Sequence, residues 1–159
     1  MCDSLPESPG RALILGLGND DRGDDAAGLL AVRELRALGV DAHEFLGDGA
    51  TLLLRWEKTD HVVLIDAVTT GRLPGTVSVW HGPPRNLRLP RSASSHGFGL
   101  AEALELASAL DRLPQSLTIY GIEATNFAPG QAASHEVLAA ARQVACTISA
   151  TVRAASLIF

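Results

Sequence analysis

Strand-length apolar runs alternate with longer segments of helical periodicity along this chain, and this alternation constrains the fold more than any other feature. Four of the apolar runs are predicted strands: 11–16, 40–45, 61–67 and 116–122. The segments between and after them are predicted helices: 25–38, 49–57, about 97–111, and one that starts at about 134. This alternation is typical of an α/β fold in which helices cover both faces of a mostly parallel sheet.

A fifth apolar run, at residues 75–81, follows the strand at 61–67 after a short connection. A parallel pair needs a crossover of about a dozen residues or more. We therefore expect the strand at 75–81 to be antiparallel to its neighbour and to lie at an edge. The predicted fold class is a three-layer α/β/α sandwich with a five-stranded, mostly parallel sheet that contains one antiparallel strand.

Composition narrows the class of protein. With 159 residues, 47% of them hydrophobic, the chain is expected to form a single domain over 11–159, preceded by a flexible tail at 1–10. The net charge of -5, without a dense run of Lys or Arg, argues against nucleic acid as a partner. No stretch approaches the roughly 18 apolar residues of a membrane span, so no membrane insertion is expected. The two cysteines lack metal-ligand spacing, and a cytoplasmic location is expected.

Three polar features fall where the loops of a parallel sheet converge, at the carboxyl ends of its strands. Four aspartates occupy six positions after the first strand, and Asp66 ends the apolar run VVLID. His96 stands at the start of the helix predicted at about 97–111. Two carboxylates and one imidazole at a common rim form a mixed ligand set that suits zinc or nickel. The sequence therefore predicts a metal-binding rim.

Each feature also has a purely structural explanation. Asp24 or Asp25 can cap the helix that begins there, and Asp66 can cap a turn at the end of its strand. His96 can be a helix-start residue that follows two capping serines. The metal-site hypothesis depends on all three features converging.

Two other motifs, for dinucleotide binding and for a Ser/His hydrolase, have weaker support in the sequence than the metal site. Gly16 and Gly18 match the first glycines of a dinucleotide fingerprint, but Asp21 stands where the third small residue is needed and would lie against a pyrophosphate. The segment SASSHG places hydroxyls beside His96, yet the chain has no Gly-x-Ser-x-Gly elbow. Gly16 and Gly18 are therefore interpreted as allowing the turn from strand to loop.

Four blocks follow one another along the chain: LGLGNDDRGDDAAG, VVLIDAVTTGRLPGTV, SSHGFGLAEALELA and YGIEATNFAPGQAASHEV. Together they cover about residues 11–145 and resemble the hydrogenase maturation endopeptidases. These proteases remove the C-terminal extension from the large-subunit precursor of nickel–iron hydrogenase. The resemblance implies the α/β/α sandwich and makes a hydrogenase large-subunit precursor the expected partner.

The resemblance also implies a metal-binding and catalytic triad. In the family, an acidic residue at the end of the first loop, an aspartate after the third strand and a later histidine bind the metal. These roles fall on Asp25, Asp66 and His96. The first ligand is often glutamate in the family, whereas here it is Asp25, and its neighbour Asp24 competes for the role. Nickel that the substrate protein supplies is the implied recognition element, and other divalent metals can occupy the site.

Two other functions stay open. The same ligands suit a maturation chaperone that senses nickel without cutting, or a zinc-type metallohydrolase that activates water. Arg85, Arg88 and Arg91, in the Pro-rich loop at 82–95, can contact the precursor or simply be solvated.

Overall fold

The computed structural model describes residues 11–58, 60–89 and 99–156. His96 and Arg91, as well as the tail predicted at 1–10, lie outside the described residues.

Within these residues, five strands form one sheet in the order β2-β1-β3-β5-β4. Their bounds are β1 Ala12–Leu17, β2 His43–Phe45, β3 His61–Val68, β4 Val77–Gly82 and β5 Ser116–Glu123. The pairs β1–β2, β1–β3 and β3–β5 are parallel, and β4 pairs with β5 in the antiparallel direction. The antiparallel edge strand expected from the short connection is therefore confirmed.

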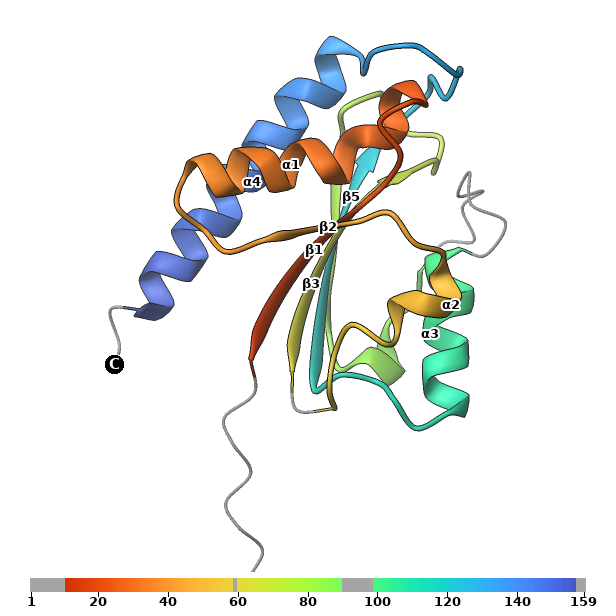
Figure 1. Cartoon of the computed structure of the whole chain (residues 1–159), viewed down its shortest axis with the longest axis vertical. Helices are drawn as coiled ribbons and strands as arrows, with labels where there is room; N and C mark the ends of the chain where they lie inside the picture. Colours follow the sequence, from red (N-terminus) through yellow and green to blue (C-terminus); the bar gives the residue numbers. More distant parts are fainter. Residues whose placement is uncertain (1–10, 59, 90–98, 157–159) are drawn as a thin grey trace, which may run out of the picture.

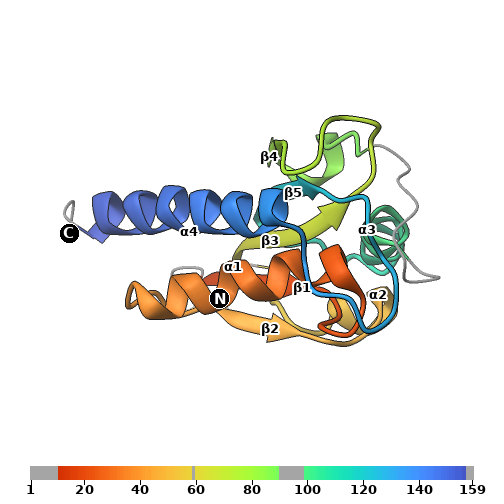
Figure 2. The ribbon, with the colours of Figure 1, turned by 90° about the horizontal axis from the view of Figure 1, so that it is seen from above.

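Helices cover both faces of this sheet (Figures 1 and 2). The helices are α1 Ala27–Ala37, α2 Gly49–Leu52, α3 Leu100–Ala109 and α4 His135–Ser156, with two short 3-10 turns, η1 Gly23–Ala26 and η2 Pro84–Asn86. Helices α1 and α4 pack together on one face, whereas α2 and α3 lie on the other. Each face has its own apolar core, and the predicted three-layer α/β/α sandwich is confirmed.

The helix predicted at 49–57 is much shorter in the structure. Helix α2 begins where the Asp48 carboxylate accepts a hydrogen bond from the Thr51 N–H, and it already ends at Leu52. Trp56, 2% exposed, then lies in the core, where its Nε1–H donates to the Arg112 carbonyl over 2.8 Å. Burial of Trp56 under the sheet, rather than helical periodicity, explains the apolar pattern of this segment.

Helix α1 begins in direct contact with the ends of two strands. A Cβ atom on Gly28 would lie 2.3 Å from the carbonyl oxygens of both Ile65 and Leu17, and one on Gly16 would lie 2.1 Å from the Gly28 oxygen. No side chain larger than hydrogen fits at these contacts. The first turn of α1 therefore rests directly on β1 and β3, and the preceding turn η1 carries Asp25 to the carboxyl end of the sheet.

The C-terminal helix α4, of 22 residues, has an amphipathic pattern. The buried stripe that faces α1 and the sheet consists mainly of small and β-branched residues: Val137, Ala140, Ala141, Val144, Ala145 and Ile148. Among the described residues, no helix is both long enough and apolar enough to cross a bilayer.

Candidate functional site

The structure brings Asp25 and Asp66 together at the carboxyl end of the sheet. Asp25 lies in η1 and Asp66 near the end of β3, and the two residues are only 3% and 6% exposed. The Asp66 Oδ1 accepts a hydrogen bond from the Ala67 N–H over 2.8 Å. Burial, and then the negative charge of the nearby Asp25, raise the pKa of Asp66 to about 7.

Two buried carboxylates at one site repel each other unless a proton or a cation is shared between them. Their oxygen atoms suit a divalent metal ion, which would hold both groups in the ionised form. The third predicted ligand, His96, lies outside the described residues, within which no three His, Cys, Asp or Glu side chains form a metal-binding group. The described part of the chain thus brings together the two acidic residues of the predicted triad.

Asp24, the competing candidate for the first ligand, has a different role. Its fully buried carboxylate accepts hydrogen bonds from three backbone N–H groups, those of Thr125 at 3.1 Å, Asn126 at 3.0 Å and Ser134 at 2.7 Å. Burial raises the pKa of Asp24, but these hydrogen bonds outweigh it and leave the pKa below its usual range. Asp24 therefore holds the loop between β5 and α4 and is not simply a helix-start residue.

Backbone contacts interlock the same two loops. The Asp24 N–H donates to the Asn126 carbonyl over 2.7 Å, and the Gly130 N–H donates to the Asp21 carbonyl over 2.7 Å. Gly23 has a φ of +56°, and a Cβ there would lie 2.5 Å from the Asn126 oxygen. The loop that carries Asp25 is thus shaped by a segment about a hundred residues later in the chain.

Glu123, at the end of β5, is a buried carboxylate that the sequence analysis did not single out. It is 1% exposed and accepts hydrogen bonds from the N–H groups of Thr70 at 2.7 Å and Gly71 at 3.0 Å, and from the Thr70 hydroxyl at 2.7 Å. It therefore anchors the loop that follows β3. The sequence pattern that pointed to Asp66, an acidic residue at the end of an apolar run, is also present at Glu123 and could have identified it.

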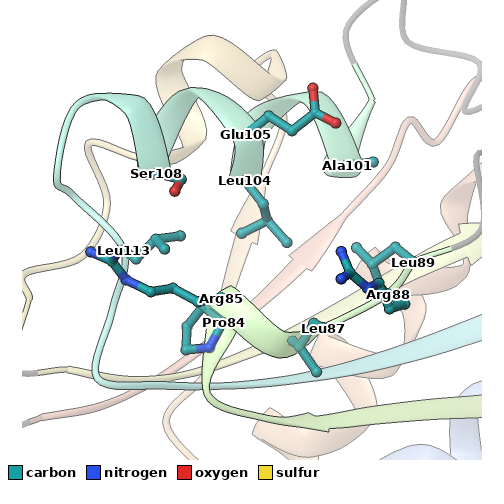
Figure 3. A pocket seen from close by; sticks show the side chains of 10 residues that line it. All are labelled: Pro84, Arg85, Leu87, Arg88, Leu89, Ala101, Leu104, Glu105, Ser108 and Leu113. Carbon is teal, nitrogen blue, oxygen red and sulfur yellow. The ribbon is translucent and has the colours of Figure 1, made fainter.

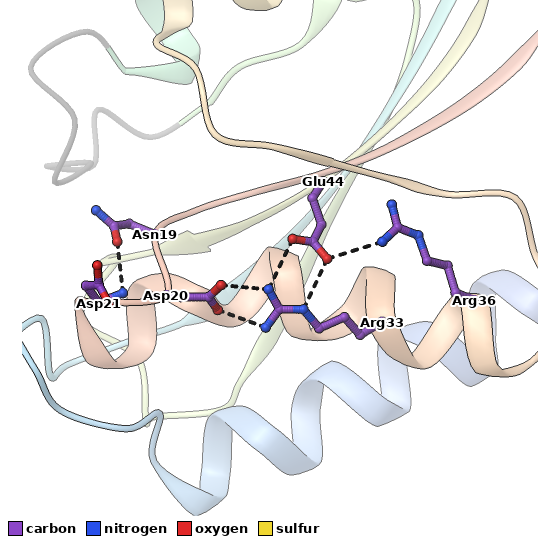
Figure 4. Close-up of polar contacts among 6 residues, drawn as sticks. All are labelled: Asn19, Asp20, Asp21, Arg33, Arg36 and Glu44. Atoms are coloured by element: carbon purple, nitrogen blue, oxygen red, sulfur yellow. Dashed lines mark hydrogen bonds and ion pairs between the residues drawn. The ribbon is translucent and has the colours of Figure 1, made fainter.

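An exposed ion-pair network holds the outer part of the acidic loop (Figure 4). The Arg33 guanidinium, on α1, donates to both Asp20 oxygens at 2.8 and 2.6 Å and to both Glu44 oxygens at 3.1 Å. Arg36 adds a contact of 3.3 Å to Glu44. The hydrogen bond from Arg33 lowers the pKa of Asp20. Arg33 thus connects the acidic loop to α1 and β2.

Arg33→Met is expected to loosen this loop without unfolding the protein. The Arg33 side chain is 42% exposed, so the loss of stability should not exceed about 1 kcal/mol. Amide hydrogen exchange of the loop at 19–23 should accelerate, because the ion pair between Asp20 and Arg33 is lost. Arg142→Met, which removes a 3.4 Å pair with Glu34 elsewhere on α1, is the control. Equal exchange in the two variants would contradict this role.

Comparison with known proteins matches this chain to proteins of hydrogenase maturation. Residues 47–151 match a family model described as hydrogenase maturation protease. The hydrogenase expression/formation protein HupD of Bradyrhizobium diazoefficiens is 30% identical in an alignment over 123 residues that covers 71% of this chain. The chain spans 62% of the length of that relative.

Two solved structures have the same fold over nearly their full lengths. The nickel–iron hydrogenase maturation protease HybD from Thermococcus kodakarensis is 31% identical, with a TM-score of 0.68, over 89% of this chain and 98% of that one. The hydrogenase maturating endopeptidase HybD from E. coli is 25% identical, with a TM-score of 0.68, over 91% of this chain and 93% of that one.

Proposed function

Since the chain belongs to the hydrogenase maturation protease family, we propose that it is an endopeptidase that removes the C-terminal extension of a nickel-loaded hydrogenase large-subunit precursor. The observation that carries this proposal is the buried pair of carboxylates, Asp25 and Asp66, at the carboxyl end of the sheet. Family relatives named as proteases or endopeptidases share this fold.

The charge of the pair supports nickel as the recognition element. With the pKa of Asp66 raised to about 7, the free protein holds a proton at the pair for part of the time at neutral pH. A divalent cation in the precursor would favour the ionised form of both carboxylates and displace that proton. In this proposal Asp25 and Asp66, together with His96, contact the nickel, so that a precursor without nickel engages the site poorly.

Processing of a purified precursor tests this function. Incubation with nickel-loaded precursor should release the C-terminal extension, which mass spectrometry would detect as one new pair of fragments. Precursor without nickel should stay intact, because the carboxylate pair then has no cation to bind. Cleavage at equal rates with and without nickel would refute recognition through nickel.

The same experiment separates the two other functions. A nickel-sensing chaperone would bind the loaded precursor and leave its mass unchanged. A zinc-type metallohydrolase would carry one firmly bound zinc per chain after purification, because its metal is resident. We expect elemental analysis to find little zinc or nickel in the protein alone, since the substrate brings the metal.

A further inference from the structure

Two adjoining cavities form a groove on the α3 side of the sheet. The first has a volume of about 260 Å³ and lies between η2 and α3 (Figure 3). The second, of about 460 Å³, lies along β4 and is lined by Thr70, Arg72, Ser78, Trp80, Arg88 and Leu89. Arg88 and Leu89 line both cavities, so the two adjoin at these residues.

One end of this groove lies near the candidate site. Thr70, which lines the second cavity, is bound by the buried Glu123. It follows Asp66 by only four residues, so the two Cα atoms are at most about 14 Å apart even in an extended chain. The groove therefore has one end within about 14 Å of Asp66 and extends from Thr70 toward Ser108 of α3.

The first cavity combines an apolar wall with cations at its ends. Leucine side chains provide the wall: Leu87, Leu89, Leu104 and Leu113. In Figure 3 the Leu104 side chain points into the cavity, and the guanidinium groups of Arg85 and Arg88 lie at opposite ends of it. The Glu105 carboxylate points away from the cavity. The groove thus presents positive charge on both sides of a leucine-lined hollow.

These cations are weakly neutralised by the protein itself. Arg85 has one exposed pair, with Asp111 at 3.6 Å, and Arg72 donates a hydrogen bond of 3.1 Å to the neutral Ser78 hydroxyl. Within the described residues, Arg88 forms no ion pair. The whole chain carries a net charge of -5. A basic groove attracts a ligand that carries carboxylates, while the acidic remainder of the protein surface repels the same ligand.

We propose that this groove binds an extended, acidic segment of the precursor, with an apolar side chain against Leu104 and carboxylates beside Arg85, Arg88 and Arg72. The segment leads along β4 to the carboxylate pair, so the groove selects which precursor reaches it. This inference rests on the proposed function, because it takes the bound protein to be the substrate of that site.

A fluorescent, blocked peptide of glutamate and leucine is the first probe, and its binding to the full chain is followed by fluorescence anisotropy. The wild-type protein should bind this peptide at least about tenfold more tightly than a matched peptide with lysine in place of glutamate. Arg88→Glu should abolish that preference. Arg142→Glu changes the net charge equally but lies on α4, on the opposite face of the sheet, and should keep it. Equal binding of the two peptides to the wild type, or unchanged binding by Arg88→Glu, overturns the proposal.

Kinetics with nickel-loaded precursor distinguish this groove from the function itself. Arg88→Glu should raise KM at least about tenfold with little change in kcat, because the residue binds substrate away from the scissile bond. An unchanged KM with normal cleavage would overturn the groove and leave the protease function intact. Arg88-dependent peptide binding by a wild-type protein that never cuts the precursor would refute the protease function and leave the groove as a docking site.

Discussion

Asp66→Asn is expected to lower processing of nickel-loaded precursor at least about a hundredfold, because an amide keeps the shape of the side chain and loses the charge that a divalent cation needs. The variant should nevertheless fold. Asp66 is buried beside Asp25, and burial followed by that charge raises its pKa, so the substitution removes an unfavourable pair of charges in the metal-free protein. Activity and stability should therefore change in opposite directions.

The pH dependence of stability checks this interpretation. The pKa of Asp66 is 3.8 in the unfolded chain and about 7 in the folded protein. Between these values the folded state holds more protons than the unfolded state, so the free energy of unfolding should fall as pH rises from 3.8 to about 7. Asp66→Asn should lack this fall and be more stable than the wild type at pH 8, as measured by denaturant unfolding without metal.

Asp21→Asn is the matched control for Asp66→Asn. It makes the same chemical change on an exposed side chain of the same loop, and it should process precursor like the wild type. His96→Ala should lose processing as Asp66→Asn does, since the triad predicts a ligand role for it. Near-normal cleavage by Asp66→Asn, or loss of activity only through unfolding, would remove Asp66 from the site.

Asp24→Asn should destabilise the protein by roughly 2–4 kcal/mol. The wild-type carboxylate accepts three backbone hydrogen bonds, whereas an asparagine would turn its NH2 group toward at least one of these N–H donors. The effect should be largest at neutral pH. Because the hydrogen bonds keep the folded pKa of Asp24 below 3.8, the contribution is lost as pH falls through that lowered folded value.

Thermal melting of Asp24→Asn beside Asp21→Asn measures this effect. Processing by Asp24→Asn should fall as well, because the loop that carries Asp25 loses its tie to the loop before α4. A protein with wild-type stability and no activity would instead indicate that Asp24 is a ligand. The sequence offered Asp24 as a helix cap or as a competing first ligand, whereas in the structure its carboxylate binds three backbone N–H groups of the loop before α4.

Most of the fold could be predicted because local patterns and connection lengths determine it. The apolar run at 61–67 became the central strand β3, and the short connection before Val77–Gly82 required an antiparallel edge strand. The prediction for 49–57 was wrong because Trp56 is buried by contacts with residues far along the chain. Periodicity cannot separate such a buried irregular segment from a helix.

The candidate site was predictable to a smaller extent. Strand-end position correctly brought Asp25 and Asp66 together, because parallel strands place their carboxyl ends at one rim. The different tasks of Asp24 and Asp25 were not predictable, since neighbouring identical residues differ only in the partners that the folded chain supplies. The need for glycine at position 28 was missed for the same reason, because it arises from the close carbonyl groups of β1 and β3.

The long span of the Asp24 contacts sets an order of events during synthesis on the ribosome. Its partners lie 101, 102 and 110 residues further along the chain. At about 5–20 residues per second, the acidic loop waits on the order of 5–20 seconds for them to emerge. Until then its backbone amides and carboxylate remain hydrated, and the carboxylate pair has no fixed geometry. We therefore expect a nascent chain to lack the assembled site, and the first loop to be made should be among the last to become ordered.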